Sequence, residues 1–316
     1  MIELQNVGKY YGNKLALDSV SFSIDHGNIV GLLGKNGAGK STLMNIMTGY
    51  FPATQGNVIV DDLSIDEAPQ EVKKKIGYLP EKPPIYDSMS VREYLCYVAR
   101  LKGVQKASVL PEVDAIISRT GLHIVENRLI RNLSKGYQQR VGIAQAMTGT
   151  PEILILDEPT VGLDPSQVVE FRTLLREYGK EHIVIISSHI LSEIAEICDR
   201  ILILNEGRLI KDCLVSEVGS SDKNHVFIRA EAEKSRFEEM IKTELPGVSC
   251  DYKGEGEPGC SDWELRADAS GEDIRKRVFR AAAKSGLNLL QMLPVNAEIE
   301  DVFLDVTSVI SSEGDG

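Results

Sequence analysis

The chain has 316 residues, of which 42% are hydrophobic and 26% are charged, and its formal net charge is −12. This length is sufficient for two domains, and the composition is ordinary for a soluble globular protein. An acidic chain without a run of about 18 apolar residues is expected neither to bind nucleic acid, which attracts basic surfaces, nor to cross a membrane by itself.

The N-terminus and the cysteines predict a cytoplasmic protein. Neither a basic segment nor a long apolar one follows Met1, so we expect no secretory signal. The five cysteines are odd in number and scattered, without Cys-x-x-Cys spacing, so neither a disulfide framework nor a metal site is predicted from them.

The first 33 residues predict a small β layer and then a buried strand. Polar and apolar residues alternate over 2–7 and 20–24, and the run 28–33 is almost entirely apolar. Tyr11 lies between these two predicted features. Its ring could stack on a purine base, although the residue by itself more often indicates a half-buried tyrosine at a strand end.

Residues 34–42 fit the phosphate-binding pattern G-x-x-x-x-G-K-[ST] and precede a predicted helix over 41–48. Gly34, Gly37 and Gly39 lack a Cβ, so the backbone can bring several N–H donors close to a polyphosphate. Lys40 would place a positive charge on the outer phosphates, and the Ser41 hydroxyl could ligate Mg²⁺. The sequence therefore predicts a nucleoside triphosphate site, to which the helix N-terminus adds the positive end of a dipole.

The segment from Glu81 to about Arg131 is predicted to be a mostly helical insertion. One strand is expected over 55–62 and another within the stretch 76–81, ending just before Glu81, because the prolines around Glu81 disfavour regular structure there. Helical periodicity then appears over the ranges 91–102 and 109–120.

Two carboxylates follow a strongly apolar strand in the next part of the chain. Ser134 is a good N-cap for a helix, and the aliphatic run 153–156 then ends in Asp157 and Glu158. A buried parallel strand would deliver both acids at its C-terminal edge, where Asp157 could hold Mg²⁺ and Glu158 could act as a general base. His189, after a second apolar strand, could donate to a γ-phosphate or could be an ordinary packed or surface histidine.

The last third of the chain is predicted to be a separate unit, because 20 acidic and 12 basic residues lie from Ser221 onward. Its expected order is β-α-β-β-α-β, which suits a ferredoxin-like α+β domain over 221–308, followed by a flexible tail over 309–316. A short helix is expected over 298–306. A structural or dimer-supporting role is favoured over binding of a regulatory ligand. The six expected elements cover 226–230, 235–243, 248–252, 263–267, 271–285 and 287–293.

Together, these motifs resemble those of the ATP-binding cassette ATPases along residues 1 to about 215. The matching motifs are Walker A (34–42), Walker B with its catalytic glutamate (153–158), the signature L-S-G-G-Q-x-Q-R (133–140), the D-loop (162–164), the switch histidine (His189) and the adenine-stacking aromatic residue (Tyr11). Because other phosphate-loop proteins lack the signature, it is the most specific of these motifs.

The resemblance implies an α/β fold over 1–220, with a RecA-like parallel core, an antiparallel β layer and the helical insertion. It also implies ATP and Mg²⁺ as cofactors and a head-to-tail homodimer that encloses two nucleotides. Catalysis is implied for Glu158, His189 and Lys40, and metal binding for Ser41, Asp157 and Glu81. The implied nucleotide-binding residues are Tyr11, Gly34, Asn36, Gly37, Ala38, Gly39, Lys40, Ser41, Thr42, Ser134, Gly136 and Asp164.

Two departures from the family pattern, together with the stretch Tyr78-Leu79-Pro80-Glu81 and the ending Glu300-Asp301-Val302-Phe303-Leu304, resemble an exporter branch that includes gliding-motility, drug-export and sodium-export ATPases. Glu81 replaces the usual glutamine, and Lys135 and Tyr137 replace glycine and glutamine in the signature. The resemblance to this branch implies an integral-membrane subunit that docks near residues 81–94 and holds the chain at the inner face of the cell membrane. Candidate contact residues, which could equally be insertion core, are Tyr86, Met89, Tyr94 and Tyr97.

A soluble ATP-switched protein of repair, chromosome organisation or translation is the alternative. The chain lacks the long coiled coil of chromosome-type relatives and the second cassette of translation-type relatives. These two differences favour the exporter subunit.

Overall fold

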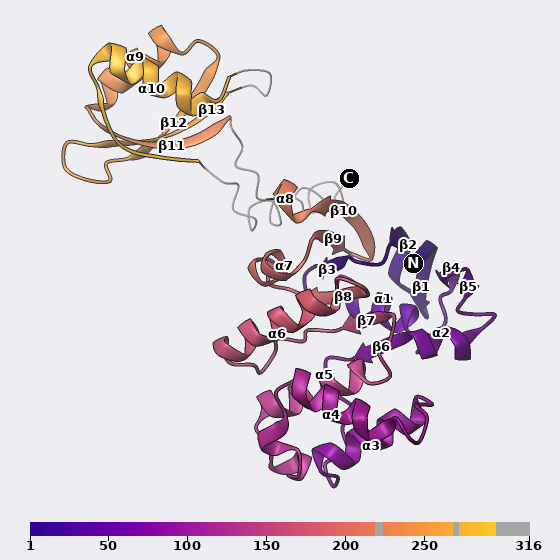
Figure 1. Cartoon of the computed structure of the whole chain (residues 1–316). Coiled ribbons are helices and arrows are strands. Elements are labelled where there is room, and N and C mark those ends of the chain that lie inside the picture. The colour runs from indigo at the N-terminus through magenta and orange to yellow at the C-terminus, as the bar shows by residue number, and fades with distance from the viewer. Residues whose placement is uncertain (219–223, 268–271, 295–316) are drawn as a thin grey trace. The chain divides into compact units, whose positions relative to one another are not determined.

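The computed structural model describes residues 1–218, 224–267 and 272–294 (Figure 1). The chain divides into two compact units, Met1–Val215 and Ser216–Gly316, close to the boundary expected from the sequence. Among the helices of the described ranges, none combines the length and the apolar character needed to span a bilayer.

The first unit contains a six-stranded sheet whose central strands are parallel. The strand order is β10-β9-β3-β8-β7-β6, in which only β10 is antiparallel to its neighbour. Every residue of β3, β7 and β8 is buried, as expected for a parallel sheet covered on both faces. The strands are β3 (Ile29–Leu33), β6 (Ile76–Leu79), β7 (Ile153–Leu156), β8 (Ile183–Ser188), β9 (Arg200–Asn205) and β10 (Arg208–Leu214).

A four-stranded antiparallel layer packs with this sheet around a shared core. Its order is β2-β1-β4-β5, and the core joins Leu4 and Val58 of this layer to Met44 of α1 and Ile155 and Ile185 of the parallel sheet. The strands are β1 (Ile2–Tyr11), β2 (Lys14–Ile24), β4 (Gln55–Val60) and β5 (Leu63–Ser64), and the nearby helices are α1 (Lys40–Met47) and α2 (Pro69–Lys75).

Strand β1 is longer than the alternating pattern predicted. Asn6 has φ +49°, and the pairing of β1 with β2 shifts register between Leu4 and Val7. A bulge of this kind moves later side chains to the other face, so the alternation breaks although the strand continues to Tyr11.

Helices fill the remainder of the first unit. The insertion is helical as expected, and Ser90 starts α3 with a capping box in which its side chain and that of Glu93 bond each other's backbone N–H groups. Helix α5 contacts β6 and β7, and α7 contacts β3 and β8. The elements are α3 (Val91–Leu101), α4 (Val109–Arg119), η1 (His123–Val125), η2 (Ile130–Asn132), α5 (Lys135–Met147), α6 (Pro165–Tyr178), α7 (Leu191–Ile197) and α8 (Val215–Val218), the last at the boundary between the units.

The second unit has the element order β-α-β-β-α-β that the sequence predicted. All strand pairs are antiparallel, in the order β12-β13-β11-β14, and the core stacks Phe237 on Trp263 with ring centroids 5.0 Å apart. Its assignment as ferredoxin-like stays a prediction. The helix expected over 298–306 and the tail over 309–316 lie outside the described residues. The elements are β11 (His225–Glu231), α9 (Lys234–Glu244), β12 (Val248–Gly254), β13 (Ser261–Ala267), α10 (Ile274–Ser285) and β14 (Asn288–Pro294).

Candidate nucleotide-binding site

A cavity of about 790 Å³ lies at the carboxyl edge of the parallel sheet and gathers most of the predicted site residues. This edge collects them because β3, β7 and β8 run parallel, so the loops that follow these strands emerge on the same side. The predicted residues that line the cavity are Tyr11, Asn36, Gly37, Gly39, Lys40, Ser41, Thr42, Glu81, Asp157, Glu158 and His189.

Glycines shape the loop between β3 and α1. Gly39 has φ +107° and is the N-cap of α1, and a Cβ on it would lie 2.9 Å from the Ala16 carbonyl oxygen. A Cβ on Gly34 would lie 2.5 Å from the Leu204 carbonyl oxygen. The loop therefore requires glycine at both positions. Gly39 is needed for its positive φ and for the close approach of the Ala16 backbone, and Gly34 is needed for the close approach of the Leu204 backbone alone.

The Lys40 ammonium is the buried cation of the site, with only 6% of the residue exposed. Its Nζ donates a hydrogen bond to the Gly34 carbonyl oxygen at 2.6 Å and lies 3.9 Å from Glu158 Oε1. Burial lowers the pKa of Lys40, and Glu158, Asp157 and Glu81 oppose that shift. A buried cation at the mouth of a glycine loop suits a polyanion, which would restore the favourable surroundings that the charge loses on burial.

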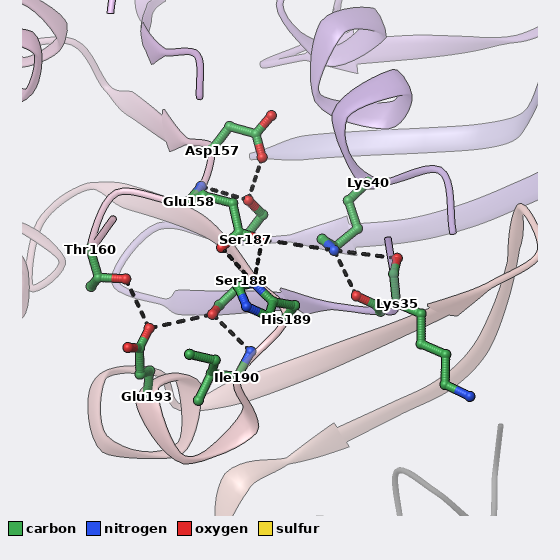
Figure 2. A network of polar contacts seen from close by, with 11 residues as sticks. Lys35, Lys40, Asp157, Glu158, Thr160, Ser187, Ser188, His189, Ile190 and Glu193 are labelled. Atoms are coloured by element: carbon green, nitrogen blue, oxygen red, sulfur yellow. Dashed lines mark hydrogen bonds and ion pairs between the residues drawn. The ribbon is translucent and has the colours of Figure 1, made fainter. Parts of the chain in front are cut away.

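Asp157 and Glu158 are held by a hydroxyl from the neighbouring strand (Figure 2). Ser187 Oγ donates to Asp157 Oδ1 at 2.5 Å and accepts from the Glu158 N–H at 2.9 Å. Glu158 has φ +48°, a left-handed conformation that is uncommon for a residue with a Cβ. The bond from its N–H group therefore supports the backbone turn that directs Glu158 into the cavity.

His189 meets Glu158 directly. Its Nδ1 lies 3.0 Å from Glu158 Oε2 and 3.2 Å from Oε1, and half of the histidine side chain is exposed. The structure thus brings together a carboxylate, an imidazole and the Lys40 ammonium from the loops after three adjacent strands.

The residues around this edge also fit a magnesium ion. Ser41 offers a hydroxyl oxygen, and Asp157 and Glu81 offer carboxylates at the wall of the same cavity. Asp157 is 2% exposed. Of its two carboxylate oxygens, only Oδ1 accepts an observed hydrogen bond, which comes from the Ser187 hydroxyl. Oxygen donors of this kind are those that Mg²⁺ prefers.

Tyr11 lies at the rim of the cavity, at the end of β1. It is 47% exposed, and its ring meets the Phe51 ring edge-to-face with centroids 5.9 Å apart. Lys9 Nζ lies 5.5 Å from the Tyr11 centroid. The ring is therefore supported by its neighbours and still offers surface for stacking.

Five predicted nucleotide-binding residues do not line the cavity. Gly34 and Ala38 lie inside the loop, where Gly34 accepts the bond from Lys40 and Ala38 is buried. Ser134 is the exposed N-cap of α5, and Asp164 is the exposed N-cap of α6. Gly136 is buried, and a Cβ on it would lie 2.6 Å from Gln167 Oε1.

Sequence reasoning missed several residues of the site. Ser187 is a polar residue at the end of an otherwise aliphatic strand, which is a usable signal for a bonding role at the sheet edge. The start of β2 and the β9–β10 turn gave no such signal, because only the tertiary fold brings them beside the phosphate-binding loop. Their residues at the cavity are Lys14, Leu15, Ala16, Glu206 and Gly207.

A second groove of about 790 Å³ shares Ser41, Glu81 and Asp157 with the first cavity. It extends between the core and the insertion, where Tyr50 and Lys102 lie on its wall.

Of the four candidate contact residues, only Tyr94 is clearly core. It is 2% exposed and donates its hydroxyl to the Pro84 carbonyl oxygen at 2.9 Å, which corrects its candidacy as a contact residue. Tyr86 is half exposed, whereas Met89 and Tyr97 are partly buried.

Comparisons with known proteins agree on one family. A family profile described as ABC transporter matches residues 17–161. The lantibiotic transport ATP-binding protein SrtF of Streptococcus pyogenes is 37% identical over 211 residues, covering 66% of this chain and 89% of SrtF. The bacitracin transport ATP-binding protein BcrA of Bacillus licheniformis is 36% identical over 214 residues, covering 67% of this chain and 69% of BcrA.

Other similarities concern the whole chain and the fold. YhcH of Bacillus subtilis (strain 168), an uncharacterized ABC transporter ATP-binding protein, is 36% identical over 322 residues, covering 99% of this chain and 98% of YhcH. A solved ATP-binding subunit of an ABC transporter superposes with a TM-score of 0.65 at 27% identity, covering 69% of this chain and 91% of that one. The cassette MJ0796, solved as a dimer in a post-hydrolysis state with ADP and Pi, superposes with a TM-score of 0.62 at 26% identity, covering 68% of this chain and 99% of that one.

Proposed function

The chain belongs to the ABC transporter family of ATP-binding proteins, as its motifs predicted, and we propose that it is the ATP-hydrolysing subunit of an exporter. The observation that carries this proposal is the convergence of Lys40, Asp157, Glu158 and His189 on one cavity. The names of SrtF and BcrA support a transport role. We place the protein in the cytoplasm, at the inner face of the cell membrane, through a separate integral-membrane subunit.

The nucleotide would bind with its phosphates in the loop from Gly34 to Thr42. Backbone N–H groups of this loop and the N-terminus of α1 would bond the phosphate oxygens, and Lys40 would exchange part of its contact with the Gly34 carbonyl for a phosphate. The exposed Tyr11 ring would stack on the base.

Hydrolysis would use the side chains at the sheet edge. Glu158 would accept a proton from the attacking water, while His189 and Lys40 would donate to the γ-phosphate oxygens. Mg²⁺, held by Ser41, Asp157 and Glu81, would neutralise charge on the phosphate oxygens.

A second copy would complete each site. Ser134 is exposed at the N-terminus of α5, where N–H groups and the helix dipole favour a phosphate, and it does not line the cavity of its own chain. We therefore propose a head-to-tail homodimer that Ser134, Gly136 and Asp164 help to close over the partner's nucleotide. ATP would favour this closed state because only a triphosphate contacts both faces.

The second groove supports docking of the membrane subunit. It is lined by Tyr50, which is 77% exposed, and by Lys102, and it reaches the proposed metal ligands Ser41, Glu81 and Asp157. A partner seated there would touch the wall that nucleotide and metal share. For the second unit, we propose a structural or dimer-supporting role.

Two measurements test this function. Affinity purification of the chain from its own cells is expected to bring an integral-membrane protein with it, and Glu158→Gln is expected to dimerise in ATP and Mg²⁺ by light scattering. A chain that stays in the soluble fraction with and without its neighbouring gene product would instead support the soluble ATP switch. A variant that stays monomeric in ATP while binding it would contradict the closed dimer.

A further inference from the structure

The carboxylate of Glu193 bridges the two loops that carry the proposed catalytic side chains (Figure 2). Glu193 lies in the first turn of α7, and its Oε2 accepts hydrogen bonds from Thr160 Oγ1 at 2.8 Å and Ser188 Oγ at 3.4 Å. Thr160 follows Glu158 by two residues, and Ser188 directly precedes His189. One carboxylate oxygen therefore joins the segment after Glu158 to the segment before His189.

The Glu158 loop is anchored on both sides of its unusual backbone conformation. Before the turn, the Glu158 N–H group donates to Ser187 Oγ. After it, Val161 N–H donates to the Glu158 carbonyl oxygen at 3.3 Å, and Thr160 is bonded to Glu193. Since φ +48° is an uncommon value for glutamate, these bonds help to keep the loop in this conformation.

The His189 loop has a matching anchor. Ser188 Oγ donates to Glu193 and accepts from the Ile190 N–H group at 3.0 Å, so the residue before His189 is bonded to the residue after it and to α7. His189 Nδ1 and Glu158 Oε2 are 3.0 Å apart. A movement of either loop would change that distance.

We infer that Glu193 is a positioning residue, which sets the separation of Glu158 and His189 by holding Thr160 and Ser188 on one oxygen. The inference rests on the proposed function, because it concerns the geometry of the same site. Glu193 does not line the nucleotide cavity, so it acts through the two loops and leaves nucleotide contacts to other residues. A charged acceptor makes the two bonds stronger than a neutral one would.

Steady-state ATPase kinetics of the full chain test this role. Glu193→Ala is expected to lower kcat about 10-fold to 100-fold, the effect of displacing a catalytic group by about 1 Å, while KM for ATP stays within about twofold. Glu193→Gln, which keeps one acceptor oxygen, is expected to retain more activity than Glu193→Ala. Glu196→Ala is the control, because Glu196 lies on the same helix and pairs with Arg172.

A combined variant separates positioning from a general loss of stability. If Glu193 acts through the two hydroxyls, Thr160→Val with Ser188→Ala should reproduce the loss, and adding Glu193→Ala should lower kcat by less than about twofold more. The inference would be overturned if the kcat losses of Glu193→Ala and of the double variant multiply when the changes are combined. Equal falls in kcat for Glu193→Ala and Glu196→Ala would also overturn it.

Hydrogen–deuterium exchange gives a measurement that does not depend on turnover. Glu193→Ala is expected to speed amide exchange in residues 158–163 and 187–191 at least about threefold, and Glu196→Ala is not. Unchanged exchange in both segments would overturn the inference even in a chain without measurable ATPase. A wild-type chain that lacks ATPase activity but shows the exchange difference would instead contradict the proposed function alone.

Discussion

At the scale of single residues, Glu158 is placed to act as the base. Its carboxylate meets His189 at 3.0 Å and Lys40 at 3.9 Å, and its own backbone is held by Ser187. Glu158→Gln keeps the shape and removes the proton acceptor, so we expect phosphate release to fall at least about 100-fold. ATP affinity, measured by calorimetry, should stay within a few-fold. A variant that hydrolyses ATP at the wild-type rate would remove Glu158 from this role.

Lys40 should determine nucleotide affinity. Because its Nζ is buried beside the Gly34 carbonyl and the acids, Lys40→Ala removes the cation that faces the phosphates. A charge-assisted hydrogen bond contributes about 1.5–3 kcal/mol, so we expect ATP to bind roughly 10-fold to 100-fold more weakly in calorimetry.

Lys35→Ala is the control for Lys40→Ala. Lys35 belongs to the same loop, but its side chain points away from Lys40 and no hydrogen bond of its ammonium is observed (Figure 2). Equal losses in the two variants would show that general positive charge, and not the position of Lys40, attracts the nucleotide.

The sequence predicted the reactive residues better than the residues that hold them. Lys40, Asp157 and Glu158 stand in short local motifs, whose spacing follows from the chemistry of phosphate binding. Ser187 bonds Asp157 and Glu193 bonds Thr160, each about 30 residues away in the chain, so these bonds exist only after β7 and β8 pair.

At the scale of elements, Lys102 caps the C-terminal end of α5, the helix that begins within the signature motif. Its Nζ donates to the carbonyl oxygens of Gln145, Ala146 and Thr148 at 3.3, 2.9 and 2.6 Å. These groups lack partners within α5, and the bonds tie the end of α3 to the end of α5. Burial lowers the pKa of Lys102 to about 8.

This lowered pKa predicts a pH effect of definite sign. An unfolded lysine titrates near 10.5, so between about pH 8 and 10.5 the unfolded chain binds more protons than the folded one. The contribution of Lys102 to stability should therefore increase as pH rises through this window. In urea melts, the unfolding free energy of wild type relative to Lys102→Met should rise by about 1–2 kcal/mol from pH 7.5 to 9.5.

Lys106→Met supplies the control, because Lys106 is an exposed lysine a few residues further along the chain. Its unfolding free energy relative to wild type should not change across the same pH range. A pH-independent difference between wild type and Lys102→Met would refute the lowered pKa.

Element boundaries were predictable where periodicity is local. The buried strands β3 and β7 are almost entirely aliphatic runs, so the sequence located them within one residue. The predicted range of β1 ended too early because the bulge at Asn6 interrupts the alternation, and a bulge depends on the partner strand. Tyr94 was ambiguous because its helical spacing suits a core face and a contact surface equally, and only packing decides between them.

At the scale of the whole molecule, the nucleotide cavity and the groove beside it share part of their lining. Ser41, Glu81 and Asp157 belong to both walls. Nucleotide and metal that displace these residues would change the shape of the groove. A partner bound in the groove would shift the same residues in return, because coupling between two sites is reciprocal. Glu81 places a carboxylate at this junction, where the motif resemblance leads us to expect glutamine.

The groove makes the docking surface testable through one residue. Tyr50 lines it and is 77% exposed, whereas Ile124 in η1 is also 77% exposed but does not line it. Tyr50→Arg places a charge in the groove and should lower co-purification with the membrane subunit at least about 10-fold, because a buried unpaired charge opposes binding. Ile124→Arg should leave co-purification unchanged, and both variants should keep the ATP affinity of the isolated chain. If both variants keep the partner, the groove is not the docking surface; if both lose it, the surface extends over the insertion.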